Sequence, residues 1–270
     1  MKTFGKIFNF LVYVFLYAPL LIMIVFSFNS SRSTTIFGGF SLKWYQEFFS
    51  NSQIMEALSN TMIVAVLSSL IATVLGTVAA VGMYKIKNKY VFSTMNTVTN
   101  IPMMNPDIVT GVSLMLLFVF VGKRVLGLDD SLSFWTLLIA HVTFNLPYVI
   151  LNVLPKLRQT DEHLYEAAMD LGCTPISAFF KVVLPAITPG IISGALMAFT
   201  LSIDDFIISY FTTGQGFQTL PLMLYSETRK GLKPDMYALS TILFVSVLIL
   251  LIIINVFQEV SERKQKGVTK

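Results

Sequence analysis

The stretch "EAAMDLGCTPISAFFKVVLP", residues 166–185, lies in a polar interval between two apolar runs of the chain. The interval covers residues 153–188, and the flanking runs cover about 133–152 and 189–210. Each run can cross a bilayer as a helix, since about 20 apolar residues suffice. We therefore expect a folded loop between two membrane spans. The second span is expected to begin at Thr188–Pro189, a hydroxyl and a proline that favour a helix start.

Two short helices are predicted within this loop. Thr160 or Asp161 can cap a helix that runs to about Leu171, and Gly172 suits its left-handed end. Thr174–Pro175 marks a second helix start, because a capping hydroxyl and a proline at the first helical position are favoured there. These signals indicate an organised segment and not a linker.

The first of these helices carries an acidic stripe. Glu162, Glu166 and Asp170 recur every four residues, which puts them on one helix face. A helix that rests on a membrane surface normally carries Lys or Arg on its polar face, and this one carries acids. The pattern favours docking into a groove on a partner protein over a solvated helix at the membrane surface.

The whole chain has the composition of a polytopic membrane protein. Of its 270 residues, 54% are hydrophobic and 13% are charged, whereas a soluble domain carries about 25% charged residues. We predict an all-α fold with six transmembrane helices in a single integral domain, residues 1–270. The first span is expected to be retained, because no small-residue cleavage site follows it. The expected spans are about 8–28, 58–84, 91–121, 133–152, 189–210 and 236–258.

The Lys and Arg residues indicate the orientation. With both chain ends in the cytoplasm, twelve of the nineteen fall on the cytoplasmic side, as the positive-inside rule requires. We therefore expect cytoplasmic N- and C-termini and a cytoplasmic loop at 153–188. The net charge of +4 then reflects topology and not nucleic-acid binding. Cys173 is the only cysteine, so neither a disulfide nor a Cys-based metal site can form within the chain.

The loop resembles the EAA loop of ATP-binding-cassette (ABC) importer permeases. In that motif Glu-Ala-Ala is followed at fixed spacing by Gly, Ile and Leu-Pro, and Val182 replaces the isoleucine here. The matching positions are Glu166, Ala167, Ala168, Gly172, Leu184 and Pro185. The resemblance implies a type I ABC importer permease fold with its core at roughly 58–258. It also implies that the loop, 153–188, forms a coupling helix that fits a cleft on an ATPase subunit.

The chain carries no sign of ATPase activity of its own. The stretch "VGKRV", residues 121–125, lacks the upstream glycine and the Ser or Thr after lysine that a phosphate-binding loop needs. We therefore expect a transport subunit and not an enzyme, with ATP hydrolysed by a partner.

Three acidic residues, Asp107, Asp204 and Asp205, lie in apolar stretches. Intramembrane charges usually face a cavity or a partner, because a charge at the bilayer centre costs about 2.5–3.5 kcal/mol on insertion scales. No intramembrane Lys or Arg is available to neutralise them, which favours a cationic cargo; an interfacial position for the pair is the alternative. Pro102 and Pro106 precede Asp107 and predict a kinked or opened helix, either as a structural feature or as part of a site.

Two other side chains invite a functional reading. Trp44 stands near Glu47, and an aromatic face beside a carboxylate suits an organic cation. An aromatic belt at the membrane interface is the alternative for this region. His141 is expected to be a hydrogen-bonded packing residue and not a metal ligand, since no second metal-binding side chain stands at helical spacing.

Two further stretches resemble the permeases of bacterial spermidine/putrescine importers: "NPDIVTGV" at 105–112 and "LSIDDFIISYFTTG" at 201–214. The resemblance implies a polyamine cargo and a heteromeric complex in the lipid of the bacterial plasma membrane. The implied partners are a homologous second permease, two copies of a cytoplasmic ATPase that binds ATP and Mg²⁺, and an extracytoplasmic polyamine-binding protein. No cofactor, metal or nucleic acid is expected on this chain.

The resemblance also suggests roles for individual residues. The expected substrate pathway consists of Trp44, Asp107, Ser202, Asp204 and Asp205, with Ser202 helping to place the carboxylates. Glu166 and Gly172 are expected to serve the ATPase contact.

Three alternative functions remain open from the sequence. A permease for another small solute, such as ferric iron or thiamine, would use the same coupling loop. An ion-coupled secondary transporter would also need intramembrane carboxylates, but it would not need the EAA loop. A membrane enzyme is disfavoured, since no span carries a nucleophile–base pair or a metal-ligand cluster.

Overall fold

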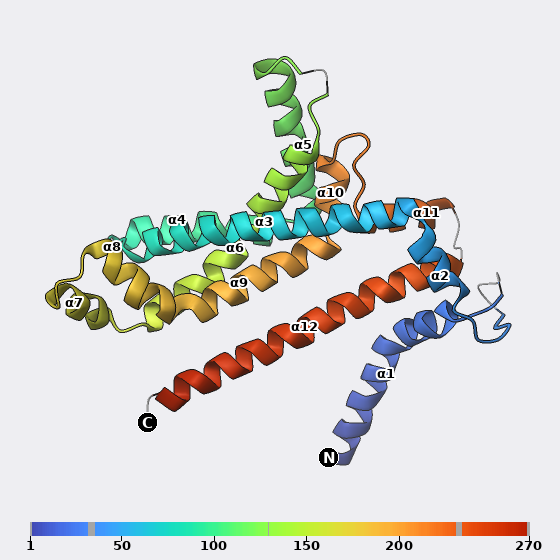
Figure 1. Cartoon of the computed structure of the whole chain (residues 1–270), viewed down its shortest axis with the longest axis horizontal. Helices are drawn as coiled ribbons and strands as arrows, with labels where there is room; N and C mark the ends of the chain where they lie inside the picture. Colours follow the sequence, from blue (N-terminus) through green and yellow to red (C-terminus); the bar gives the residue numbers. More distant parts are fainter. Residues whose placement is uncertain (1, 32–35, 129, 231–233, 269–270) are drawn as a thin grey trace. The chain divides into compact units, whose positions relative to one another are not determined.

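The computed structural model describes residues 2–31, 36–128, 130–230 and 234–268, and these residues are almost entirely helical (Figure 1). The one pairing of extended residues within them is an isolated antiparallel bridge between Asn29 and Phe40. The α-helices are α1 (Lys2–Ser27), α2 (Lys43–Ser50), α3 (Ser52–Tyr84), α4 (Lys89–Met104), α5 (Asp107–Phe120), α6 (Phe134–Gln159), α7 (Glu162–Asp170), α8 (Pro175–Ala178), α9 (Leu184–Asp204), α10 (Ile207–Thr212), α11 (Leu220–Lys230) and α12 (Pro234–Val268). Two π-helical turns, η1 (Val121–Val125) and η2 (Phe179–Val183), follow α5 and α8.

Six helical segments of the described chain are long and apolar enough to cross a membrane, which confirms the predicted number. They are Gly5–Ser27, Ser52–Tyr84, Asp107–Val125, Phe134–Gln159, Pro175–Asp204 and Met236–Ile253. Their outer faces carry large apolar side chains. On α3, for example, Leu70, Val74 and Val78 are each more than half exposed at four-residue spacing. Such a stripe suits lipid or a partner helix, because a soluble protein rarely exposes contiguous apolar surface of this kind.

The third predicted span, 91–121, is corrected by the structure. It is divided into α4 and α5, and the candidate span begins only at Asp107. Asn105, at the end of α4, is extended, with φ −79° and ψ 143°. The ring of Pro106 accounts for this, because a proline disfavours helical dihedrals in the residue before it. The helix that was predicted to be kinked or opened is therefore interrupted completely between α4 and α5.

The predicted start of the fifth span at Thr188–Pro189 is wrong. The span runs from Pro175 to Asp204, and Pro189 lies inside α9. Thr188 does not cap a helix; its hydroxyl donates back to the Leu184 carbonyl at 2.7 Å. A membrane helix tolerates an internal proline when side chains and local π geometry compensate for the missing N–H group. α9 is such a helix, since it continues through Pro189 to Asp204.

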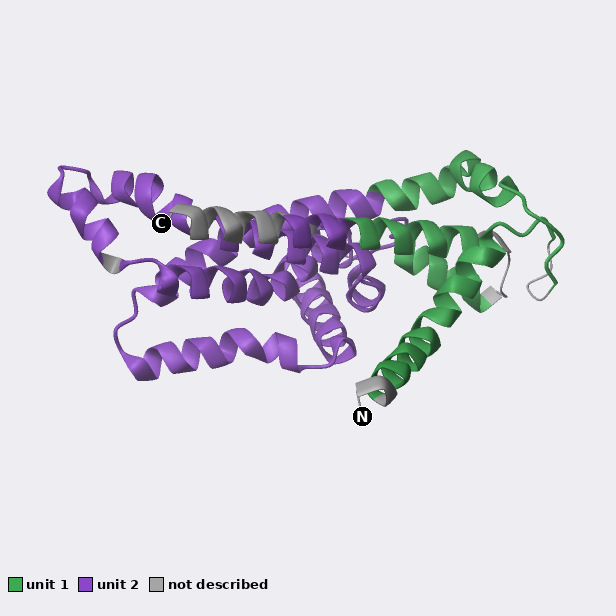
Figure 2. Cartoon of the chain, turned by 90° about the horizontal axis from the view of Figure 1, so that it is seen from below, with its two compact units in different colours: residues 1–59, 220–249 green, residues 60–219, 250–270 purple. Residues whose placement is uncertain are grey.

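The chain forms two compact units, coloured separately in Figure 2. The first unit comprises residues 1–59 and 220–249. Its core is made by apolar side chains from α2, α3, α11 and α12, namely Phe48, Ile54, Ala57, Leu220, Met223 and Leu239. Burial of each of the larger side chains contributes about 1.5–3 kcal/mol, so this cluster stabilises the unit.

The second unit comprises residues 60–219 and 250–270 and contains the predicted coupling loop and the carboxylate pair. In its core α9 packs against α6. The small residues at four-residue spacing on α9 make this close approach possible: Gly190, Gly194, Ala198 and Ser202 are all buried. A Cβ atom on Gly194 would lie 3.1 Å from the Cα atom of Val149 on α6. These small residues therefore form one face of α9, as their four-residue spacing in the sequence indicates, and α6 is the helix that this face contacts.

Candidate functional site

The two adjacent carboxylates lie where α9 ends. Asp204 is the last residue of α9, Asp205 is extended with φ −65° and ψ 124°, and α10 begins at Ile207. From Leu184 to Asp204 a helix rises about 30 Å, which is the thickness of the hydrocarbon core. The pair therefore lies at the opposite end of this span from the EAA motif.

Asp205 turns inward and caps α10. Its Oδ1 accepts the Ile208 backbone N–H at 3.2 Å, and its Oδ2 accepts the Ser209 backbone N–H at 2.8 Å. The Ser209 hydroxyl donates to the same Oδ2 at 2.9 Å. An N-terminal helix turn leaves backbone N–H groups without partners, and a carboxylate is well suited to accept them. The side chain of Asp205 is 10% exposed as a result.

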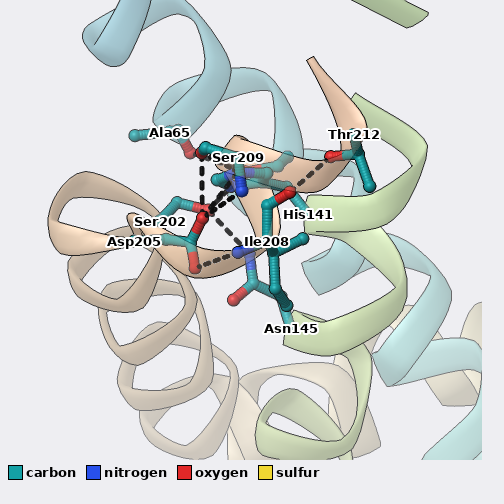
Figure 3. A network of polar contacts seen from close by, with 9 residues as sticks. Ala65, His141, Asn145, Ser202, Asp205, Ile208, Ser209 and Thr212 are labelled. Atoms are coloured by element: carbon teal, nitrogen blue, oxygen red, sulfur yellow. Dashed lines mark hydrogen bonds and ion pairs between the residues drawn. The ribbon is translucent and has the colours of Figure 1, made fainter. Parts of the chain in front are cut away.

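His141 of α6 lies at the centre of the surrounding polar network (Figure 3). Its Nδ1 is 3.0 Å from the Ser202 hydroxyl, and its Nε2 is 3.1 Å from the Ser209 hydroxyl. The same Nε2 is 3.5 Å from Asp205 Oδ2, and the side chain of His141 is 1% exposed. The prediction of a hydrogen-bonded packing histidine is confirmed.

Ser202 connects two more helices to this network. Its hydroxyl accepts the Asn145 Nδ2–H group of α6 at 2.9 Å and lies 2.8 Å from the Ser68 hydroxyl of α3. Figure 3 shows Ser202 of α9 beside His141 and Asn145 of α6. The network therefore joins α3, α6, α9 and α10. The sequence gives no direct sign of it, because His141 and Ser202 are 61 residues apart.

The combination of serine, histidine and carboxylate is also found in hydrolytic sites, but here it holds neighbouring helices together. Ser202 is 3% exposed and His141 is fully buried, so a substrate has no access to the hydroxyl. A nucleophilic serine must be reachable from the reacting carbonyl. Asn145 is fully buried as well, and its Oδ1 has no hydrogen-bond partner among the described residues.

Asp204 has the opposite environment to Asp205. It is exposed, and no other residue in the described part of the chain donates a hydrogen bond to its carboxylate. Asp107 is also exposed and lies in the first turn of α5, where a negative charge is favoured by the helix dipole. No ion pair among the described residues joins Asp107 or Asp204 to a Lys or Arg. Both carboxylates are therefore available to a cation.

Trp44, the aromatic member of the predicted pathway, is buried within its own compact unit. It belongs to the first compact unit, is 4% exposed, and its Nε1–H donates to the Asn29 carbonyl at 2.6 Å. The Lys43 ammonium lies 5.2 Å from the centroid of its ring. The ring therefore packs inside the first unit, and its assignment to the substrate pathway stays a prediction. In the sequence this region resembles a cation site because an aromatic and an acidic residue are close together in the chain. In the structure the two do not form one surface.

The EAA segment folds as two short helices. Asp161 Oδ1 accepts the His163 backbone N–H at 3.0 Å, so Asp161, and not Thr160, caps α7. Gly172 has φ +85°, the left-handed conformation expected of it. The Thr174 hydroxyl accepts the Ser177 backbone N–H at 3.3 Å and begins α8, with Pro175 at the first position. All three local predictions are confirmed, and of the two candidate capping residues Asp161 is the one that caps α7.

The surface of this segment carries both polar and large apolar side chains. The side chain of Glu166 is 72% exposed and lies 3.5 Å from His163, while the side chain of Glu162 lies outside the described part of the chain. Ala167 is exposed and Ala168 is 7% exposed. Large apolar side chains project nearby: Leu171 is 87% exposed and Ile176 is 72% exposed.

The end of the motif is a π-helical turn. Leu184 begins α9 and Pro185 follows as its second residue, directly after η2. Proline has no backbone N–H to give to the carbonyl four residues earlier, which disturbs the α-helical ladder at this point. Insertions of this kind recur at functional sites. Leu184 is partly buried and Pro185 is exposed.

Comparison with known proteins gives a consistent answer. Residues 72–267 match the family described as "Binding-protein-dependent transport system inner membrane component". The chain is 40% identical over 240 residues to the putrescine transport system permease protein PotI of Escherichia coli K12, covering 87% of this chain and 83% of that protein. It is 38% identical over 260 residues to the spermidine/putrescine transport system permease protein PotC of the same strain, covering 96% and 94%.

Solved structures agree on the fold. A bacterial ABC transporter that imports the acidic polysaccharide alginate has a chain with a TM-score of 0.73 at 13% identity, covering 97% of this chain and 95% of that one. A chain of the MetNI methionine ABC transporter in an inward-facing conformation has a TM-score of 0.56 at 19% identity, covering 82% and 100%. At such identities the likeness concerns the fold alone. Taken with the family match over most of its length, this fold shows that the chain belongs to the inner membrane components of binding-protein-dependent transport systems, the permeases of ABC importers.

Proposed function

We propose that this chain is one permease subunit of an ATP-driven importer that carries polyamines, spermidine or putrescine, across the bacterial plasma membrane. The observation that carries the proposal is the similarity, at 38–40% identity over most of the chain, to two permeases named for putrescine and spermidine/putrescine transport. As an ABC permease the chain is not an enzyme, and partner ATPase subunits hydrolyse the ATP.

The exposed carboxylates support a cationic cargo. Asp204 lies at one end of the α9 span and Asp107 begins the α5 span, and both are free of Lys and Arg partners within the described residues. A polyamine carries several ammonium groups, each of which loses water as it enters a membrane protein. Carboxylate oxygens replace that water at low cost, whereas an anionic cargo would be repelled.

The EAA segment supports a docking role toward the ATPase. Leu171 and Ile176 are large apolar side chains with no cover from the described chain, and Glu166 stands exposed beside them. An exposed apolar patch with a polar rim is typical of a protein interface. In the proposed complex α7 enters a cleft of the ATPase and passes its movement to α9 through η2 and Pro185.

The proposed assembly has four kinds of subunit. This chain pairs with a homologous second permease, two copies of a cytoplasmic ATPase hold ATP and Mg²⁺, and an extracytoplasmic polyamine-binding protein delivers the cargo. The distribution of Lys and Arg supports cytoplasmic N- and C-termini, with the 153–188 loop on the same side. A single integral domain over residues 1–270 remains part of the proposal.

The decisive test is uptake by the assembled complex in proteoliposomes. Radiolabelled spermidine and putrescine should accumulate only when ATP, the ATPase and the binding protein are all present. The matched control is the same complex with an ATPase variant that binds ATP but does not hydrolyse it, which should abolish accumulation. Accumulation without ATP would indicate an ion-coupled transporter. ATP-dependent uptake of iron or thiamine, with none of polyamine, would overturn the assigned cargo but retain the importer.

A further inference from the structure

In the hydrogen bonds that the hydroxyl groups around His141 make, the donor and the acceptor can be assigned. Each hydroxyl has one proton to donate, and an ionised carboxylate can only accept. The Ser209 hydroxyl gives its proton to Asp205 Oδ2 at 2.9 Å. It must therefore act as the acceptor in its 3.1 Å contact with His141 Nε2, so that this nitrogen carries the proton.

The other ring nitrogen then completes the chain of hydrogen bonds. In a neutral imidazole with a proton on Nε2, Nδ1 is an acceptor, and the Ser202 hydroxyl at 3.0 Å is its donor. Because its one proton goes to Nδ1, the Ser202 hydroxyl accepts from Asn145 Nδ2 at 2.9 Å and from the Ser68 hydroxyl at 2.8 Å. This Ser68 contact is shorter than the alternative contact of the Ser68 hydroxyl with the Ala65 carbonyl, at 3.4 Å. The donors run in one direction: Ser68, Ser202, His141, Ser209 and finally Asp205. Bonds aligned in this way polarise one another, and the carboxylate receives the whole chain.

We propose that His141, as the tautomer with its proton on Nε2, is the positioning residue that holds Asp205 toward α10, and that the two adjacent carboxylates thereby divide their roles. Asp205 locks the junction between α9 and α10, while Asp204 is the one of the pair that meets the cargo. The identity of that cargo rests on the proposed function; the locking of Asp205 does not.

The geometry gives Asp205 little freedom to act as a cargo ligand. Release of its carboxylate would leave the Ile208 and Ser209 backbone N–H groups and the Ser209 hydroxyl without their acceptor. Buried polar groups that lose their partners are costly. It would also remove the acceptor at the end of the chain that runs through His141. Asp204 is exposed and receives no hydrogen bond from another described residue, so it can bind a cation without any of these losses.

The first experiment reads the tautomer directly. The full chain, purified without a polyhistidine tag and placed in lipid nanodiscs, is labelled with ¹⁵N-histidine. His163, the only other histidine, is replaced by His163→Gln so that one ring gives the signal. We expect a neutral ring with its proton on Nε2 and an acceptor-type Nδ1. A ring with its proton on Nδ1 would overturn the proposal. Ser209→Ala, which removes the acceptor of Nε2–H, should shift the Nε2 signal.

The second experiment measures coupling without any cargo. In the same nanodiscs, Asp205→Asn and His141→Gln should each lower the Tm, and the double variant should be no less stable than the worse single variant. Asp204→Asn is the matched control beside it in the chain and should leave the Tm unchanged. Additive losses for His141 and Asp205, or an equal loss for Asp204→Asn, would contradict the division of roles.

The third experiment connects the division to transport by the assembled complex. Asp204→Asn should raise the KM for polyamine by about tenfold, the effect of one lost hydrogen-bonded charge. Asp205→Asn should lower the amount of intact complex but leave the KM of the remaining complex near wild type. A raised KM for Asp205→Asn with unchanged Tm would overturn the inference. A wild-type complex that transports no polyamine would instead overturn the proposed function and leave the first two experiments intact.

Discussion

Gly190 of α9 faces the backbone of Asn152 on α6 so closely that a Cβ atom on Gly190 would lie 2.7 Å from the Asn152 carbonyl oxygen. The same atom would lie 2.8 Å from Cγ of Lys156. A backbone carbonyl in a helix cannot move aside as a flexible side chain can. Glycine at this position therefore sets the distance between the two helices that support the coupling segment at one end and the carboxylates at the other.

Gly190→Ala is therefore expected to destabilise the chain, although alanine is the better helix former. The expected loss is about 1–3 kcal/mol, the usual cost of overpacking a core. Gly82→Ala is the matched control, because Gly82 also lies in a helix but has no atom within 4 Å of its would-be Cβ. That variant should gain about 0.5–1 kcal/mol from helix propensity. Thermal unfolding in nanodiscs measures both, and a Gly190→Ala variant as stable as Gly82→Ala would show that α6 and α9 can separate freely.

The sequence is sufficient where the structure is decided locally. The cap at Asp161, the left-handed Gly172 and the helix start at Thr174 each depend on neighbours a few residues away, and each was predictable. The small-residue face of α9 follows from helical periodicity alone, so it was predictable too. Its partner was not, because periodicity says nothing of which helix approaches.

The candidate site could be predicted only in part, because the role of each carboxylate depends on where its side chain points. Helical spacing does separate the two acids, because it places Asp205 near Ala198 on the small-residue face and Asp204 away from that face, but it does not identify the partners of Asp205. The end of α9 between them turns one carboxylate outward and the other toward Ser209. The partners of Asp205 come from α6 and α10, and no local pattern connects His141 with Ser202 across 61 residues. The helix start predicted at Thr188–Pro189 was wrong, because α9 begins at Leu184 and continues through Pro189, and the Thr188 hydroxyl donates to the Leu184 carbonyl and does not cap a helix.

Gly172 tests the ordering of the coupling segment. Its φ of +85° lies in a region where other residues cost roughly 1–2 kcal/mol, with asparagine among the best tolerated. Gly172→Val should therefore disorder the end of α7 and reduce cargo-stimulated ATP hydrolysis by the complex. Gly172→Asn should retain most of it. No other atom lies within 4 Å of a Cβ at this position, so the two variants differ in backbone preference and not in a clash. Equal hydrolysis by both variants would show that the left-handed turn does not matter for coupling.

The exposed apolar surface beside α7 makes a second prediction about the ATPase. Leu171→Asp and Glu166→Arg change side chains that are 87% and 72% exposed, so neither should alter the Tm of the chain. Both should weaken association with the ATPase, one by removing apolar area from the interface and the other by reversing a charge. Co-purification of the ATPase with the permeases measures this. Leu126→Asp offers a comparison outside the EAA segment, since Leu126 is 63% exposed and follows η1. If all three variants retain the ATPase equally, the docking surface lies elsewhere.

Trp44 provides a test that separates packing from transport. Trp44→Phe keeps an aromatic ring but removes the Nε1–H that donates to the Asn29 carbonyl at 2.6 Å. We expect the loss of this hydrogen bond to lower the free energy of unfolding by about 0.5–1.5 kcal/mol. The KM for polyamine should stay at its wild-type value, because a ring that is 4% exposed has no surface to offer a cargo.

Trp135→Phe is the control, since Trp135 is 68% exposed and should tolerate the change. Unfolding followed by the fluorescence of the remaining tryptophan reports stability in each variant. A raised KM with unchanged stability in Trp44→Phe would place this residue in the substrate pathway, because only contact with the cargo would then account for the effect.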